Sequence, residues 1–143
     1  MERFDPDASP GYLVKRVQQS LRRRSDAALR GLGVSMAQYV VMRALADQPE
    51  ASAAELSRRC FVTRQTLQDL LAGLRAAGLV ESSGPPRGRS QALRLTDDGR
   101  DRLHDADNAV FGVEEVMLDG LADRSRGQLA ELLTRCAENL EAG

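Results

Sequence analysis

The stretch that decides the fold lies in the middle of the chain, where residues 52–78 read SAAELSRRCFVTRQTLQDLLAGLRAAG. Ser52 and Glu55 have the spacing of a capping box, in which side chains satisfy the free backbone N–H groups at the start of a helix. Thr63 is a good N-cap for a second helix, and the leucines that follow it at i, i+3, i+4 and i+7 share one helix face. The stretch therefore predicts a helix of about two turns, a tight turn, and a helix from about residue 63 to 77.

A β-hairpin is predicted directly after the second helix, which Gly78 ends. Residues 79–82 (LVES) and 91–95 (QALRL) alternate between apolar and polar side chains well enough to form two short antiparallel strands. The segment between them reads SGPPRGRS, and its glycine and proline content is typical of a loop. Arg87 and Arg89 give the tip of this hairpin a positive charge.

Longer helices are predicted on both sides of this central stretch. Apolar residues recur at helical spacing over about 12–30, and the Ser35–Gln38 capping box begins another helix. After the hairpin, Thr96 and the two aspartates that follow it are typical of a helix start, and a further apolar stripe ends near Glu141.

The order of these elements predicts a mainly α fold with a small β-hairpin, organised as a winged helix-turn-helix with long N- and C-terminal dimerisation helices. We divide the chain into a flexible lead-in at 1–11, a winged helix-turn-helix DNA-binding domain at 35–96, and a helical dimerisation region made of 12–34 and 97–143. The apolar stripes of the terminal helices exceed what the small central core can cover. We therefore expect a second copy of the chain to cover them.

The composition is that of an ordinary globular chain, because 42% of the 143 residues are hydrophobic and 29% are charged. The net charge of −1 hides an asymmetry: residues 52–100 carry eight basic and five acidic groups, and residues 101–143 carry four and ten. A basic centre beside an acidic end favours a polyanion bound to the centre. Without a leader or a stretch of about 18 apolar residues, a cytoplasmic location without a membrane partner is expected.

No set of residues predicts an enzyme, a metal site or a cofactor. His104 is the only histidine, Cys60 and Cys136 are far apart, and the sequence has no glycine-rich phosphate cradle. Both cysteines take apolar helix positions and are predicted to be buried and inert, whereas His104 is predicted on a solvated helix face. The alternative for Cys60 is a redox sensor, because the arginines around it would lower the pKa of an exposed thiol.

The helix at 63–77 holds the candidate site. With its leucines toward the core, a rotation of about 100° per residue turns several polar side chains outward. Arginine pairs with guanine O6 and N7, and glutamine pairs with adenine N6 and N7, in the major groove of DNA. The predicted DNA contacts are Thr63, Arg64, Gln65, Thr66, Gln68 and Asp69 on the helix, and Arg87 and Arg89 on the hairpin. A solvated polar face without a partner is the alternative.

Several runs, taken together, resemble the MarR family of bacterial transcriptional regulators. They are AELSRR at 54–59, VTRQTL at 62–67 and LRLTDDGR at 93–100, with long helices at both ends. The resemblance covers about residues 12–140 and implies a sequence-specific DNA-binding regulator, with a repressor favoured. The hairpin of the family commonly carries an acid two positions before an arginine. Here Arg87 stands in the place of the acid and Arg89 in that of the arginine.

The resemblance also implies a homodimer on a pseudo-palindromic operator, with half-site centres about 34–36 Å apart. It further implies relief of repression by a small, often aromatic or phenolic, anion bound between the dimer helices and the DNA-binding lobe. The residues that would line this pocket are Tyr12, Arg16, Met36, Tyr39, Val40 and Arg43. Core packing explains Tyr39 and Val40 equally well. The alternative from another class is a winged-helix module that binds protein.

Overall fold

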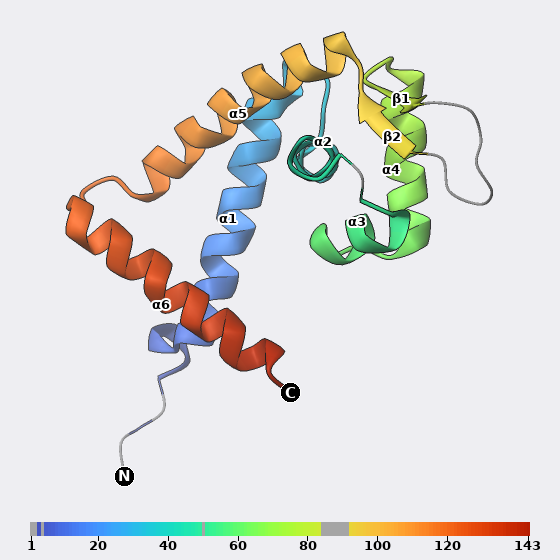
Figure 1. Cartoon of the computed structure of the whole chain (residues 1–143). Coiled ribbons are helices and arrows are strands. Elements are labelled where there is room, and N and C mark those ends of the chain that lie inside the picture. Colours follow the sequence, from blue (N-terminus) through green and yellow to red (C-terminus); the bar gives the residue numbers. More distant parts are fainter. Residues whose placement is uncertain (1–2, 4, 50, 84–91) are drawn as a thin grey trace. The chain divides into compact units, whose positions relative to one another are not determined.

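Figure 1 shows the fold in a computed structural model, which describes residues 3, 5–49, 51–83 and 92–143. The chain divides after Val113 into two compact units, and the second comprises Glu114–Gly143. The elements in chain order are η1 (Pro6–Ala8), α1 (Pro10–Arg30), α2 (Met36–Asp47), α3 (Ala53–Arg59), α4 (Arg64–Ala76), β1 (Val80–Ser83), β2 (Ala92–Leu95), α5 (Asp97–Met117) and α6 (Asp123–Glu141). This order confirms the predicted mainly α fold with a small hairpin.

Helix α1 begins at Pro10, two residues before the start that periodicity predicts. Ser9 is extended and holds the N-cap position, and Pro10 occupies the first helical position, where a missing N–H costs no hydrogen bond. The predicted lead-in at 1–11 therefore includes the short helix η1 and the start of α1. Apolar spacing does not reveal η1 because that turn buries none of its residues.

Capping side chains set the starts of α2 and α3 at the predicted residues. The Ser35 hydroxyl accepts from the Gln38 N–H at 3.1 Å, and the Gln38 side chain accepts from the Ser35 N–H at 3.0 Å, which completes the predicted capping box. Ser52 accepts from the Glu55 N–H at 3.2 Å, but its own hydroxyl donates to the Glu55 carboxylate at 3.1 Å. The second box is therefore formed on one side only.

One hydrophobic core joins the central helices to the terminal ones. Leu67, Leu71 and Leu74 of α4 are fully buried in it. Leu29 of α1 and Leu103 of α5 belong to the same cluster. The core thus extends beyond residues 35–96, and the predicted central domain is incomplete without parts of α1 and α5.

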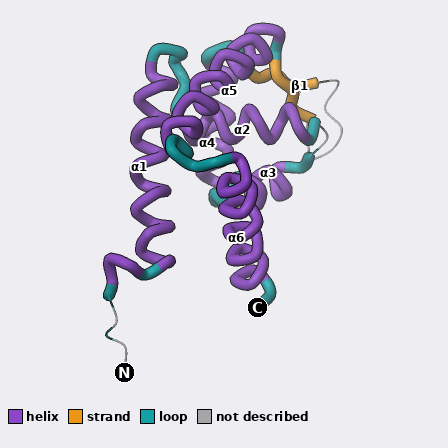
Figure 2. The backbone as a smooth tube through the Cα atoms, turned by 90° about the vertical axis from the view of Figure 1, so that its left-hand side faces the viewer, coloured by secondary structure: helices purple, strands orange, loops and turns teal. Residues whose placement is uncertain are grey.

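Strands β1 and β2 form the predicted antiparallel hairpin, and they are the only strands in the described part of the chain (Figure 2). Val80 faces Leu95 in the register, and both side chains are buried. Glu81 faces Arg94, and their exposed side chains form an ion pair of 2.9 Å between Oε1 and Nε. The alternation of apolar and polar residues therefore anchors the hairpin to the core by one face.

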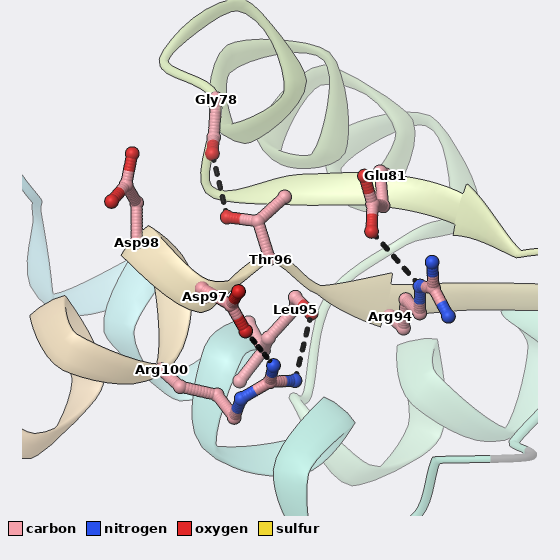
Figure 3. A pocket seen from close by; sticks show the side chains of 8 residues that line it. All are labelled: Gly78, Glu81, Arg94, Leu95, Thr96, Asp97, Asp98 and Arg100. Atoms are coloured by element: carbon pink, nitrogen blue, oxygen red, sulfur yellow. Dashed lines mark hydrogen bonds and ion pairs between the residues drawn. The ribbon is translucent and has the colours of Figure 1, made fainter.

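Thr96 and Gly99 fasten the hairpin to the start of α5. The Thr96 hydroxyl donates to the Gly78 carbonyl at 2.6 Å (Figure 3). It also accepts from the Gly99 N–H at 3.0 Å, so it closes the hairpin base and caps the helix. A Cβ on residue 99 would lie 2.1 Å from the Leu79 carbonyl oxygen. Glycine is therefore required here, because two backbone segments approach too closely for any side chain.

The second unit consists of the end of α5, a turn and α6. The Arg126 guanidinium ties them together, since it donates to both carboxylate oxygens of Glu115 at 3.0 and 3.1 Å and to the carbonyls of Leu118 and Leu121. Gly120 turns the chain with a φ of 83°. These bonds are local and do not depend on the first unit.

Helix α6 buries none of its residues in the single chain. Leu132, Leu133 and Leu140 are 63%, 44% and 87% exposed, so the surplus apolar stripe predicted for this helix is present. Cys136 is exposed on the same helix, and the prediction that it is buried is wrong for the single chain. An apolar helix position predicts burial only where another element covers the stripe.

Candidate nucleic-acid interface

Helix α4 presents its N-terminal end to solvent. Thr63 caps the helix, with its hydroxyl accepting from the Thr66 N–H at 3.1 Å, and the first buried side chain is Leu67. The predicted contacts on this helix are all exposed, namely Thr63, Arg64, Gln65, Thr66, Gln68 and Asp69. The side chains that precede Leu67 at the start of α4 are thus exposed, and the start of a recognition helix is the part that reaches base edges in a major groove.

Some of these side chains are oriented by their neighbours and others are free to bind a partner. The Gln65 amide donates to Asp69 Oδ1 at 3.2 Å, which fixes the amide plane and leaves its oxygen and one N–H available. Arg64 and Gln68 form no hydrogen bond or ion pair with any other described residue. A donor fork and two amides at one exposed helix end can pair with the edges of guanine and adenine.

The turn between α3 and α4 contains an unusual residue, Phe61. Its φ is 56°, in the left-handed region that favours glycine, and its side chain is 89% exposed. The chain must turn from α3 to α4 within residues 60–63, which include no glycine, so a bulky residue takes the left-handed position. The sequence predicts a tight turn here, and the absence of glycine from it is the signal that another residue must adopt this conformation.

The electrostatic character of this surface is positive. Arg58 at the end of α3 and Arg64 at the start of α4 lie on either side of the turn, and neither has a carboxylate partner among the described residues. The free N–H groups and the dipole of α4 add positive potential at its first turn. This surface therefore attracts an anionic backbone.

The hairpin tip with Arg87 and Arg89 lies outside the described residues. A surface pocket at the base of the hairpin is lined by Gly78, Glu81, Arg94, Leu95, Thr96, Asp97, Asp98 and Arg100 (Figure 3). The guanidinium of Arg94 contacts Glu81, and that of Arg100 contacts Asp97 and the Leu95 carbonyl. Because both guanidiniums have a carboxylate partner, this pocket lacks the free positive charge of the α4 end.

The residues predicted to line a ligand pocket fall into two sets. Tyr12 and Arg16 are exposed on α1, and no hydrogen bond or ion pair joins them to the α2 residues within the described chain. The other four lie at i, i+3, i+4 and i+7 on one face of α2 and are half-buried: Met36, Tyr39, Val40 and Arg43. The first three pack against the hydrophobic core.

Tyr39 and Arg43 meet at a carboxylate that our sequence prediction missed, that of Asp107 on α5. The Tyr39 hydroxyl donates to Asp107 Oδ1 at 2.7 Å, and Arg43 Nη1 donates to Asp107 Oδ2 at 2.7 Å. Arg43 Nε and Nη2 donate to Asp47 Oδ1 at 3.2 and 2.9 Å, and Arg59 Nη2 lies 3.4 Å from Asp47 Oδ2. We call these five residues the Asp107 cluster. It joins α5 through α2 to α3.

The pKa shifts of the cluster follow from these contacts. Burial raises the pKa of Tyr39 above its usual value, and the hydrogen bond to Asp107 raises it further because deprotonation would place two anions together. The hydrogen bond to Asp47 raises the pKa of Arg43. Both groups therefore stay protonated and act as donors to a carboxylate at neutral pH.

The other candidate functional residues, Cys60 and His104, show no arrangement that favours a redox or metal site. Cys60 is buried as predicted, and burial raises the pKa of its thiol, which disfavours the redox alternative that requires an exposed thiolate. His104 is exposed on α5, as predicted. Among the described residues, no three His, Cys, Asp or Glu side chains are placed to hold a metal ion. In the same part of the chain, no helix combines the length and apolar character needed to cross a membrane.

Comparison with known proteins gives consistent matches. A sequence model of the MarR family matches residues 32–90. The HTH-type transcriptional repressor Rv2887 of Mycobacterium tuberculosis is 33% identical over 130 residues, which are 90% of this chain and 94% of that protein.

Solved structures match over nearly the whole chain. The M. tuberculosis MarR family protein Rv2887 in complex with salicylic acid has a TM-score of 0.75 at 33% identity and covers 91% of this chain and 97% of its own. The complex of the same protein with DNA has a TM-score of 0.75 at 32% identity, and the match covers 91% of this chain and 98% of that one. The PcaV regulator of Streptomyces coelicolor, in complex with its natural ligand, has a TM-score of 0.75 at 26% identity and covers 96% and 98%.

Proposed function

Because the chain belongs to the MarR family, we propose that it is a transcriptional repressor that binds operator DNA as a homodimer and is released by a small aromatic acid. The observation that carries this proposal is the exposed, capped and positively charged N-terminal end of α4. The similar protein Rv2887 is named a transcriptional repressor and has been crystallised with DNA. We assign the protein no catalytic activity, and its place of action is the cytoplasm, where bacterial DNA lies.

In this proposal, the first turns of α4 enter the major groove. Arg64 pairs with guanine, and Gln65 and Gln68 pair with adenine or neighbouring base edges. Asp69 holds the Gln65 amide in one plane through their 3.2 Å hydrogen bond. Thr63 and Thr66, whose hydroxyls pair at 3.0 Å, lie close enough to the helix start to contact phosphate.

The hairpin supplies the second contact, with Arg87 and Arg89 in or beside the minor groove. The base of the hairpin supports this placement, because its apolar face is buried in the same core as α4.

The homodimer is formed by the region that we assign to residues 12–34 and 97–143. Exposed apolar side chains on the two terminal helices support this assignment: Tyr12, Leu13, Val14 and Val17 on α1, and Leu132, Leu133 and Leu140 on α6. A single chain leaves these groups in water at a hydrophobic cost of about 25 cal/mol per Å². A two-fold dimer places two α4 helices on a pseudo-palindromic operator.

The effector is a small aromatic carboxylate or phenolate, bound by the α2 face with Tyr39 and Arg43 as donors and Met36 and Val40 as apolar lining. Tyr12 and Arg16 approach the same ligand from α1. Support comes from the salicylic acid complex of the similar protein Rv2887 and from the donors that Tyr39 and Arg43 already offer to a carboxylate.

Footprinting of the purified protein on the DNA upstream of its own gene tests the proposal. We expect protection of two half-sites about one helical turn apart, and loss of affinity with salt at a slope of about 0.9 per phosphate contact. Salicylate at increasing concentration should release the DNA. Binding that is insensitive to sequence and salt would overturn the proposal and favour a winged-helix module that binds protein.

A further inference from the structure

In the Asp107 cluster, Tyr39 and Arg43 together bind one carboxylate, and in this chain that carboxylate is the side chain of Asp107. We propose that Asp107 is an internal competitor of the effector, and that an aromatic acid binds by replacing the Asp107 carboxylate on the Tyr39 hydroxyl and the Arg43 guanidinium. This inference rests on the proposed effector response. It adds a residue on α5 that sets the affinity for the effector and couples the effector to DNA binding.

The geometry is that of ligand recognition. Both oxygens of the Asp107 carboxylate are held, one by a neutral hydroxyl and one by a guanidinium, each at 2.7 Å. A monocarboxylate that replaces it brings the same charge and the same two acceptors, so the exchange leaves no donor unpaired. A neutral amide or ester brings no charge for the guanidinium and cannot replace it on equal terms.

The site is accessible enough for the exchange. The side chains of Arg43 and Asp107 are 40% and 33% exposed. Ion pairs at this exposure are screened by solvent and contribute little to stability, so their loss does not unfold the protein. The aromatic ring of the acid finds an apolar surface one helical turn away, because Met36 and Val40 share the face of α2 that carries Tyr39 and Arg43.

Replacement of the Asp107 carboxylate by the effector affects the DNA-binding helices through Arg43. In the free protein this guanidinium is fixed between Asp107 and Asp47, and Asp47 also contacts Arg59 at the end of α3. Helix α3 directly precedes the turn and α4. Release of Asp107 removes its polar contacts with Tyr39 and Arg43 between α5 and α2, while the apolar packing of the two helices remains. The Arg43 guanidinium then keeps only Asp47 as a carboxylate partner, and Asp47 is the residue that contacts Arg59 on α3. Asp107 is therefore a positioning residue for DNA binding.

The test compares Asp107→Asn and Asp107→Ser with the control Asp105→Asn. Asp105 lies on the same helix, is exposed, and has no ion pair or hydrogen bond among the described residues, so its substitution removes the same charge without freeing Tyr39 and Arg43. Isothermal titration of the full-length dimer with salicylate is expected to show at least about fivefold tighter binding in both Asp107 variants, because the internal competitor is gone. Asp105→Asn should stay within about twofold of wild type.

A second measurement makes the inference specific. Without salicylate, both Asp107 variants should bind the operator more weakly than wild type and Asp105→Asn, since the ion pair that positions Arg43 between α5 and α2 is lost. A purely structural role would weaken DNA binding without improving salicylate binding. If wild type and both Asp107 variants bind salicylate with equal affinity, the role of Asp107 as a competitor is overturned, and the proposed effector is not affected. Failure of wild type and both variants to bind salicylate would overturn the proposed effector as well.

Discussion

The exposed end of α4 and the Asp107 cluster are both polar surfaces of the first unit, but they are built in opposite ways. At the α4 end, Arg64 and Gln68 point into solvent without partners among the described residues. In the Asp107 cluster, every charged side chain is paired with one of the opposite sign. Unpaired donors on a capped helix suit recognition of an external partner, whereas a closed set of pairs suits a contact that opens and closes.

The largest effect is expected outside these two surfaces, at Gly99, where the base of the hairpin meets the start of α5. Gly99→Ala places a Cβ 2.1 Å from the Leu79 carbonyl oxygen and should lower the free energy of unfolding by about 3 kcal/mol or more. Gly112→Ala on the same helix is the matched control, because nothing lies within 4 Å of its Cβ position. That change should raise the stability by about 0.5–1 kcal/mol. Urea unfolding followed by circular dichroism measures both, and equal effects would show that the hairpin and α5 do not meet as described.

The next largest effect is expected on DNA binding, and it tests whether the glutamines at the α4 end read DNA bases or only support the fold. Gln68→Ala and Gln65→Ala should each cost about 1–3 kcal/mol of binding free energy on the operator and much less on random DNA. Both amides are exposed, so the stability should change by less than about 0.5 kcal/mol. Gel-shift titrations on both DNA sequences measure the difference. Equal losses on the two sequences would show that the amides do not read bases.

A smaller effect is expected from the Asp107 cluster at high pH. The pKa of Tyr39 is raised in the folded chain, so the folded state holds its proton above pH 10 while the unfolded state releases it. The contribution of Tyr39 to the free energy of unfolding is therefore fully present below pH 10. It falls as the pH rises above 10, by at most about 1 kcal/mol per pH unit at this half-exposed site. Tyr39→Phe should remove this part of the dependence of stability on pH. Unfolding midpoints at pH 8, 10 and 11 for wild type and Tyr39→Phe measure the difference, and an equal dependence on pH in the two proteins would contradict the prediction.

The smallest effect is expected at Phe61. Its side chain is 89% exposed and buries little area, and its φ of 56° costs about 1 kcal/mol for a non-glycine residue. Phe61→Gly relieves that cost but adds freedom to the unfolded chain, so the free energy of unfolding should change by less than about 0.5 kcal/mol. A thermal unfolding curve measures it. A large loss would mean that the phenyl ring is covered in the dimer.

Much of the fold was predictable because its signals are local. Ser35, Ser52 and Thr63 each cap a helix with a side chain close in sequence, and the spacing of the α4 leucines alone predicts which face is buried. The exposed end of α4 follows from the same residues. The start of α1 at Pro10 was missed because the residues around it bury little surface, and hydrophobic spacing reports only burial.

The Asp107 cluster was not predictable in the same way. Asp107 is 68 positions from Tyr39 and 64 from Arg43, and nothing in its neighbourhood on α5 distinguishes it from Asp105, which stays exposed. The exposure of Cys136 was not predictable either, since an apolar stripe on a helix does not reveal whether another element covers it. Gly99 stood in a recognisable run, but its need to be glycine came from the carbonyl of Leu79.

The amino-acid sequence by itself determined the helices, their caps, the hairpin and the side chains that α4 offers to DNA, because these depend on hydrogen bonds and spacings within a few residues. Only the tertiary structure decided that Tyr39 and Arg43 share the carboxylate of Asp107, that the core includes Leu29 and Leu103, and that Gly99 lies against a backbone carbonyl. Contacts of this kind join residues far apart in the chain. Their partners are chosen by how whole helices pack and not by any local pattern.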